Sequence, residues 1–141
     1  MITTKNIIAI YKLANPSEIK HGLTWYVNAN TDCMRIANTL ELPLHIVIGV
    51  VSALSPNNKW ERNIVNAEDL CKAFINGQDM DSIKVSTYHK MKQKAWHILE
   101  TMPSYDETII ILNGKKIVSF FRNISGDETD ITIDGHARNI Y

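Results

Sequence analysis

Asn113-Gly114, followed directly by Lys115 and Lys116, is the segment of this 141-residue sequence best suited to chemistry. Asparagine and glycine both tolerate positive φ, so the pair favours a tight turn between the short helical stretches on either side. Such a turn exposes the first backbone N–H groups of the second helix, where the helix dipole also attracts anions. The two lysines add positive charge at the same place. The sequence therefore predicts a helical hairpin that binds an anion such as a phosphate.

The segment resembles the hairpin of the helix–hairpin–helix DNA glycosylases, the endonuclease III-like superfamily, whose motif reads L-P-G-V-G-x-K-T-A. Residues 112–116 (LNGKK) cover the second half of that motif, with Gly114 on its second glycine and Lys116 on its lysine. Residues 133–136 (IDGH) cover the family's V-D-T-H, with Asp134 on the aspartate. The separation, 134 − 116 = 18 residues, equals the one expected in the endonuclease III branch.

The resemblance runs from about residue 44 to residue 140. Residues 51–56 (VSALSP) look like the segment near the damaged base, and Lys94 with Ala95 resembles a short pattern in the helix before the hairpin. The sequence departs from the family at Leu112, which replaces the first hairpin glycine, and at Ile117, which replaces a threonine. The cysteines that ligate an iron–sulfur cluster in the family do not follow.

The resemblance implies a DNA-repair enzyme, from a bacterium or a phage, that excises damaged or modified bases from double-stranded DNA. Asp134 would stabilise the oxocarbenium-like sugar or activate the nucleophile. A buried Lys116 would attack the sugar carbon and form a Schiff base, which adds abasic-site lyase activity. If Asp134 acts without Lys116, water is the nucleophile. The residues expected to contact DNA are Asn113, Gly114, Lys115, Ser55, Asn57, Asn58 and His136.

Each of these residues also has a simpler interpretation. Lys116 is equally typical of a surface lysine after a turn, and Asp134 of a helix N-cap. His136 is typical of a residue in the first turn of a helix, and residues 55–58 of an ordinary polar loop. Two other functions therefore stay open. In the first, the hairpin binds DNA phosphates without catalysis. In the second, the chain is a helical interaction protein that uses another surface.

Composition fits one soluble domain that needs no cofactor. Apolar residues make up 45% of the chain and charged residues 21%, and 15 basic residues balance 15 acidic ones. Two cysteines, Cys33 and Cys71, are too few for an iron–sulfur cluster and are expected to be buried thiols. His89 and His97 lack the further ligands of a zinc site. Without a leader or a long apolar stretch, we expect a cytoplasmic protein that spans no membrane; its oligomeric state stays open.

The apolar periodicity predicts an all-α fold, a compact helical domain over residues 1–141 with a DNA-glycosylase-like hairpin. Residues 1–42 form N-terminal helices without a counterpart in the family, and residues 43–141 form the glycosylase-like core. The apolar run 44–54 fits either a buried strand or a helix, and its helical neighbours favour the helix. Capping residues are expected at Asn58 and Ser86. Seven residues follow Asp134, so we expect a short final helix or a C-terminus shortened relative to the family.

Overall fold

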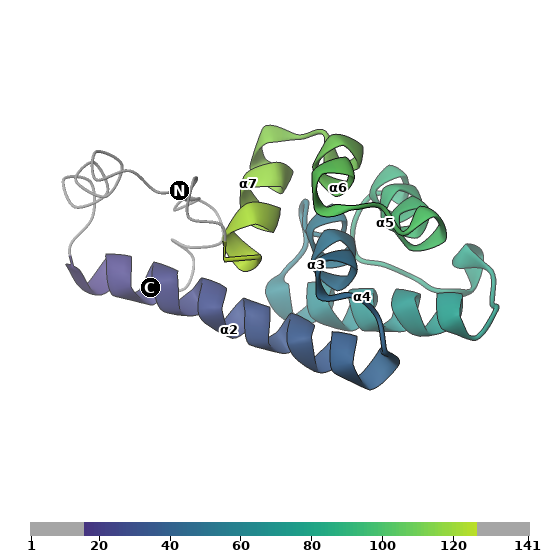
Figure 1. Ribbon diagram of the computed structural model, residues 1–141, viewed down its shortest axis with the longest axis horizontal. Helices are drawn as coiled ribbons and strands as arrows, with labels where there is room; N and C mark the ends of the chain where they lie inside the picture. The colour runs from purple at the N-terminus through teal and green to yellow at the C-terminus, as the bar shows by residue number, and fades with distance from the viewer. Residues whose placement is uncertain (1–15, 127–141) are drawn as a thin grey trace.

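The computed structural model describes residues 16–126, and within them the chain is helical, without a strand (Figure 1). The prediction of an all-α fold is thereby confirmed. Helices are labelled as in Figure 1, and η1 is a single 3-10 turn. The elements are α2 (Pro16–Leu40), α3 (Leu44–Ala53), α4 (Trp60–Ile75), η1 (Met80–Ser82), α5 (His89–Thr101), α6 (Tyr105–Leu112) and α7 (Lys115–Ile124).

Helix α3 is the centre of the domain and contacts α2, α4, α5, α6 and α7. The ambiguous apolar run is therefore a helix. Because a helix satisfies its backbone hydrogen bonds internally, α3 can be buried without a neighbouring strand to pair with. Gly49 is required by close packing, since a Cβ there would lie 2.9 Å from Cγ2 of Thr108 on α6. His45 ties the start of α3 to the α5–α6 link through a 2.8 Å hydrogen bond between its Nε2 and the Pro103 carbonyl.

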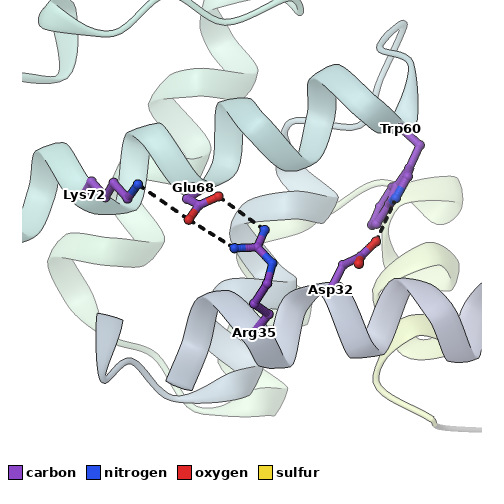
Figure 2. Close-up of polar contacts among 5 residues, drawn as sticks. All are labelled: Asp32, Arg35, Trp60, Glu68 and Lys72. Atoms are coloured by element: carbon purple, nitrogen blue, oxygen red, sulfur yellow. Dashed lines mark hydrogen bonds and ion pairs between the residues drawn. The ribbon is translucent and has the colours of Figure 1, made fainter. Parts of the chain in front are cut away.

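Helices α2 and α4 are joined on their outer side by polar contacts (Figure 2). The Arg35 guanidinium donates two hydrogen bonds of 3.3 Å to the carboxylate of Glu68. Lys72 lies 3.6 Å from the same carboxylate. Three residues before Arg35 on α2, the Asp32 carboxylate accepts a 3.2 Å hydrogen bond from the indole N–H of Trp60. These contacts fix how α4 lies along α2.

Beneath these contacts Cys33 and Cys71 are free and buried, which confirms their predicted state. Burial, together with nearby negative charge, raises the pKa of each thiol to about 12. Both cysteines therefore behave as small apolar side chains at neutral pH and pack in the α2–α4 contact.

The Glu68 ion pair predicts a small, pH-dependent contribution to stability. The hydrogen bond from Arg35 holds the pKa of Glu68 below its usual value. A lowered pKa adds stability above the unfolded value of about 4.3, and this is lost as the pH falls through the folded value. Because the Arg35 side chain is 54% exposed, the pair is screened, and we expect Glu68→Gln to cost at most about 1 kcal/mol at neutral pH.

Urea unfolding of both proteins at pH 7 and pH 3 measures this contribution. The difference between wild type and Glu68→Gln should be present at pH 7 and should shrink as the pH falls below about 4, because the Glu68 carboxylate then begins to protonate. Glu100→Gln, at an exposed position of α5, is the matched control and should change little at either pH. A difference of the same size at both pH values would show that Glu68 acts through packing rather than through its charge.

The helix caps differ from the prediction at two places. The Asn58 side chain donates to the Leu54 carbonyl and to Asn66 instead of capping α4, whose N-cap is Lys59. Helix α5 starts at His89, and the backbone N–H of Ser86 donates to Asn66. The Asn58 side chain is thus engaged in contacts other than a cap, whereas Ser86 lies before the N-cap of α5, which is Tyr88. The capping box of Ser104 and Glu107, which begins α6, was not predicted from the sequence.

Candidate functional site

The α6–α7 hairpin forms as predicted, with two residues between the helices. Helix α6 ends at Leu112, and α7 begins at Lys115. Asn113 has the left-handed conformation, with φ 50° and ψ 24°, and it caps α6. Gly114 is extended, with φ −129° and ψ 133°. The turn thus needs positive φ at Asn113 alone, and its chain reversal comes from one left-handed residue followed by one extended residue.

The first turn of α7 carries positive charge at the end of the helix that favours negative charge. Lys115 and Lys116 are both exposed, and this turn contains no acidic residue. The helix dipole is positive at its N-terminus, so the dipole and the two lysines together favour an anion near this turn. The expectation that Lys116 is buried is wrong for the structure without DNA, in which this residue of the first turn is exposed.

Helix α7 is held in place by two aromatic residues in its second half. Phe120 and Phe121 are both buried. The Phe120 ring lies 5.7 Å from Trp25 and 6.3 Å from Trp60, and the Phe121 ring lies 4.9 Å from Tyr105. At the far end of α7 the Ile124 carbonyl accepts a 2.8 Å hydrogen bond from Asn30 of α2. The apolar face therefore fixes the direction in which the hairpin points.

Lys94 of α5 reaches the hairpin directly. Its Nζ donates a 2.7 Å hydrogen bond to the carbonyl of Leu112, the last residue of α6. A cation at a helix C-terminus is favourable, because the last carbonyls are unpaired and the dipole is negative there. Burial lowers the pKa of Lys94, and the neighbouring charge of Lys90 adds to that effect. Lys94 and Lys90 thus extend the positive charge of the hairpin onto α5.

The Lys94 contact predicts a modest role in holding the turn. Lys94→Met removes the ammonium and keeps most of the side-chain length, so the Leu112 carbonyl loses its donor. We expect a loss of about 1 kcal/mol in the free energy of unfolding. The NMR signals of Asn113 and Gly114 should also shift. Lys90→Met removes the same charge from an exposed site one turn away and should leave the signals of the turn in place. Equal effects of both variants would contradict this role.

The loop between α3 and α4 places its three predicted DNA-binding residues differently. Ser55 and Asn58 are buried, and the Ser55 hydroxyl donates a 2.7 Å hydrogen bond to the Ser52 carbonyl. Asn57 is exposed and has a positive φ of 53°. In the free chain, Ser55 and Asn58 therefore hold the loop together, whereas Asn57 is the member of this set that faces solvent.

Asp134 and His136, the remaining predicted site residues, lie outside the described residues. The structure therefore shows where Lys116 lies, and the closeness of Lys116 to Asp134 stays a prediction. Over residues 2–141 the chain matches a sequence family described as a family of unknown function. The chain belongs to DUF7178. Comparisons with curated proteins and with solved structures gave no match.

Within residues 16–126 of this DUF7178 member, no cluster of three or more His, Cys, Asp or Glu side chains is arranged to hold a metal ion. No single described helix is long and apolar enough to cross a membrane. Helices α2 and α3 reach that length and composition only together, and they are bent by 120° where they join.

Two buried polar residues of α4 in this DUF7178 domain were not predicted from the sequence. Asn63 and Asn66 are both buried. Asn66 joins three segments, because its Oδ1 accepts hydrogen bonds from the Asn58 side chain and from the Ser86 backbone. The sequence does contain a signal for their burial. Both asparagines lie three or four residues from apolar residues of α4, so they share the helix face that packs against the core.

Proposed function

We propose that this protein binds double-stranded DNA through the α6–α7 hairpin and excises a damaged or modified base. Lys116 is the proposed nucleophile, and Asp134 the carboxylate that supports it. Asn113, Gly114 and Lys115 contact the phosphate backbone in this proposal.

The observation that carries the proposal is the pair of lysines in the exposed first turn of α7, directly after a two-residue turn. A phosphate at this position would accept hydrogen bonds from the first N–H groups of α7 and would offset both lysine charges. The helix dipole and the two lysines therefore all favour an anion bound at this position. Lys94 and Lys90 on α5 provide further positive charge along which a phosphate backbone can run.

Base excision adds a covalent step at the same place. The proposal is that Lys116 Nζ attacks C1′ of the nucleotide while the base leaves with the electron pair of the glycosidic bond and takes up a proton. Loss of the amine proton and ring opening give a Schiff base. The resemblance to the helix–hairpin–helix glycosylases and the 18-residue separation from Asp134 support these roles. Because Lys116 is exposed in the free chain, the bound DNA would have to bury it.

A second candidate is a DNA-binding module without catalysis. The exposure of Lys116 favours it, since an exposed lysine is sufficient to bind a phosphate. The two candidates share the hairpin and differ in whether Lys116 forms a covalent bond.

Salt-dependent binding to a fluorescent duplex tests the shared part. We expect the logarithm of the binding constant to fall linearly with the logarithm of the salt concentration. Lys115→Ala and Lys116→Ala should each reduce the slope by about 1. Lys72→Ala, on the α2–α4 face beside Glu68, is the matched control and should leave the slope unchanged. A chain that binds no duplex at low salt would contradict both candidates and leave the helical interaction protein.

A further inference from the structure

The turn of the α6–α7 hairpin consists of an Asn-Gly pair, in which the asparagine side chain can react with the backbone. The backbone nitrogen of the glycine attacks the side-chain amide carbon, and glycine has no side chain of its own to obstruct the approach. The chain contains this pair twice, at residues 76–77 and 113–114. Asn76 directly follows α4 and Asn113 directly follows α6, and both are exposed. Sequence and exposure therefore do not separate the two pairs.

The two pairs differ in the hydrogen bonding of the attacking nitrogen. The Gly77 N–H donates a 3.2 Å hydrogen bond to the Phe74 carbonyl. Within residues 16–126, by contrast, the Gly114 N–H has no acceptor and the side-chain amide of Asn113 has no partner. A hydrogen-bonded N–H must give up its acceptor before the nitrogen can attack, and that loss costs free energy. The fold therefore hinders the reaction at Asn76 and leaves both reacting groups free at Asn113.

The reaction exchanges the amide of Asn113 for a carboxylate. The Gly114 nitrogen forms a bond to Cγ of Asn113, the bond between Cγ and Nδ2 breaks, and ammonia leaves with the proton of the Gly114 N–H. Water then opens the cyclic imide. Cleavage at Cγ gives aspartate, and cleavage at the backbone carbonyl carbon gives isoaspartate, in which the main chain runs through Cγ. Either product has one negative charge at position 113.

We propose that Asn113 is a site of spontaneous deamidation and that the carboxylate formed there weakens the binding of DNA by the hairpin. The second part of this inference rests on the proposed function. Lys115 and Lys116 lie two and three residues after Asn113, in the exposed first turn of α7. A carboxylate beside this turn offsets the charge of the lysines and repels a phosphate. The modified hairpin therefore has a lower affinity for an anion.

Peptide mass spectrometry of protein incubated at mildly alkaline pH measures the rate of deamidation at each pair. The same measurement in urea gives the rate of each pair in the unfolded chain and so corrects for the neighbouring sequence. We expect the ratio of the folded rate to the unfolded rate to be at least several-fold larger for Asn113 than for Asn76. A ratio for Asn113 that is no larger than the ratio for Asn76 would overturn the proposed modification site.

Asn113→Asp supplies the aspartate product directly. Aspartate tolerates the left-handed conformation as asparagine does, so the turn should be retained. We expect this variant to bind a duplex several-fold more weakly than the wild type at low salt, with a salt slope reduced by about 1. Asn76→Asp adds the same charge after α4, and as the matched control it should bind like the wild type. Equal binding by Asn113→Asp and the wild type would reject the effect on DNA.

The two measurements keep this inference separate from the proposed function. Preferential deamidation at Asn113 in a protein that binds no duplex would reject the hairpin as a DNA contact and leave the modification site. Duplex binding without preferential deamidation at Asn113 would reject the modification site and leave the hairpin as a DNA contact.

Discussion

Lys116→Ala is expected to abolish the covalent adduct between this protein and a duplex that contains an abasic site. The amine of Lys116 would condense with the sugar aldehyde at C1′ and lose water to give a Schiff base. Sodium borohydride supplies a hydride that reduces the Schiff base to a stable amine. The trapped complex migrates as a larger species in a denaturing gel. Without the amine the Schiff base cannot form, so the expected loss is complete rather than partial.

Lys115→Ala is the matched control for this experiment. Lys115 lies next to Lys116 in the same exposed turn and has the same charge. Its removal should weaken DNA binding and still allow trapping at saturating protein. Equal loss in both variants, at protein concentrations that saturate the DNA, would show that the lysines bind phosphate and that neither is the nucleophile. An adduct that persists in Lys116→Ala would exclude Lys116 from the covalent step.

Phe121→Ala is expected to produce the largest loss of stability among the changes considered for α7. The ring is fully buried and lies 4.9 Å from the Tyr105 ring of α6. Its removal leaves a cavity between the two helices of the hairpin, which costs about 3 to 5 kcal/mol for a buried phenylalanine. Urea unfolding followed by circular dichroism measures the loss. Because Phe121 fixes α7 against α6, DNA binding should weaken as well.

Ile110→Ala on α6 is the control for this stability prediction. Ile110 is 73% exposed, so its truncation should change the free energy of unfolding by about 0.5 kcal/mol or less. A loss for Phe121→Ala no larger than that for Ile110→Ala would contradict the packing of α7 against α6.

The helices and the hairpin were predictable from sequence because their signals are local. Pro16 begins α2, and Gly77, with a φ of 72°, follows the end of α4. Asn113 ends α6 as its type predicts. Each of these features depends on the backbone preference of one residue, and sequence patterns report such preferences well.

The caps at Asn58 and Ser86 were mispredicted because their partners are distant in sequence. The Asn58 side chain could cap a helix and instead donates to Asn66, 8 residues away; Ser86 contacts Asn66, 20 residues away, through its backbone N–H and lies before the N-cap of α5, Tyr88. A side chain that can cap a helix can equally well bond another segment, and tertiary packing decides between them. Lys94 shows the same limit, since its contact with the Leu112 carbonyl spans 18 residues.

The candidate site was predictable in its residue types and not in its exposure. The sequence placed Lys116 after the turn, and the structure confirms that position. Burial of Lys116, by contrast, depends on where the first turn of α7 lies relative to the neighbouring helices, and that is set by the packing of Phe120 and Phe121 farther along α7. The paired role of Asp134 stays a prediction.

The central proposal for this protein is that the α6–α7 hairpin is the surface that binds DNA. Titration of the isotope-labelled protein with a short duplex, followed by backbone amide NMR, tests this claim residue by residue. We expect the amide signals of Gly114, Lys115 and Lys116 to shift most, and those of exposed positions on α2, such as Arg35, to stay in place. Saturated binding with unchanged hairpin signals would contradict it.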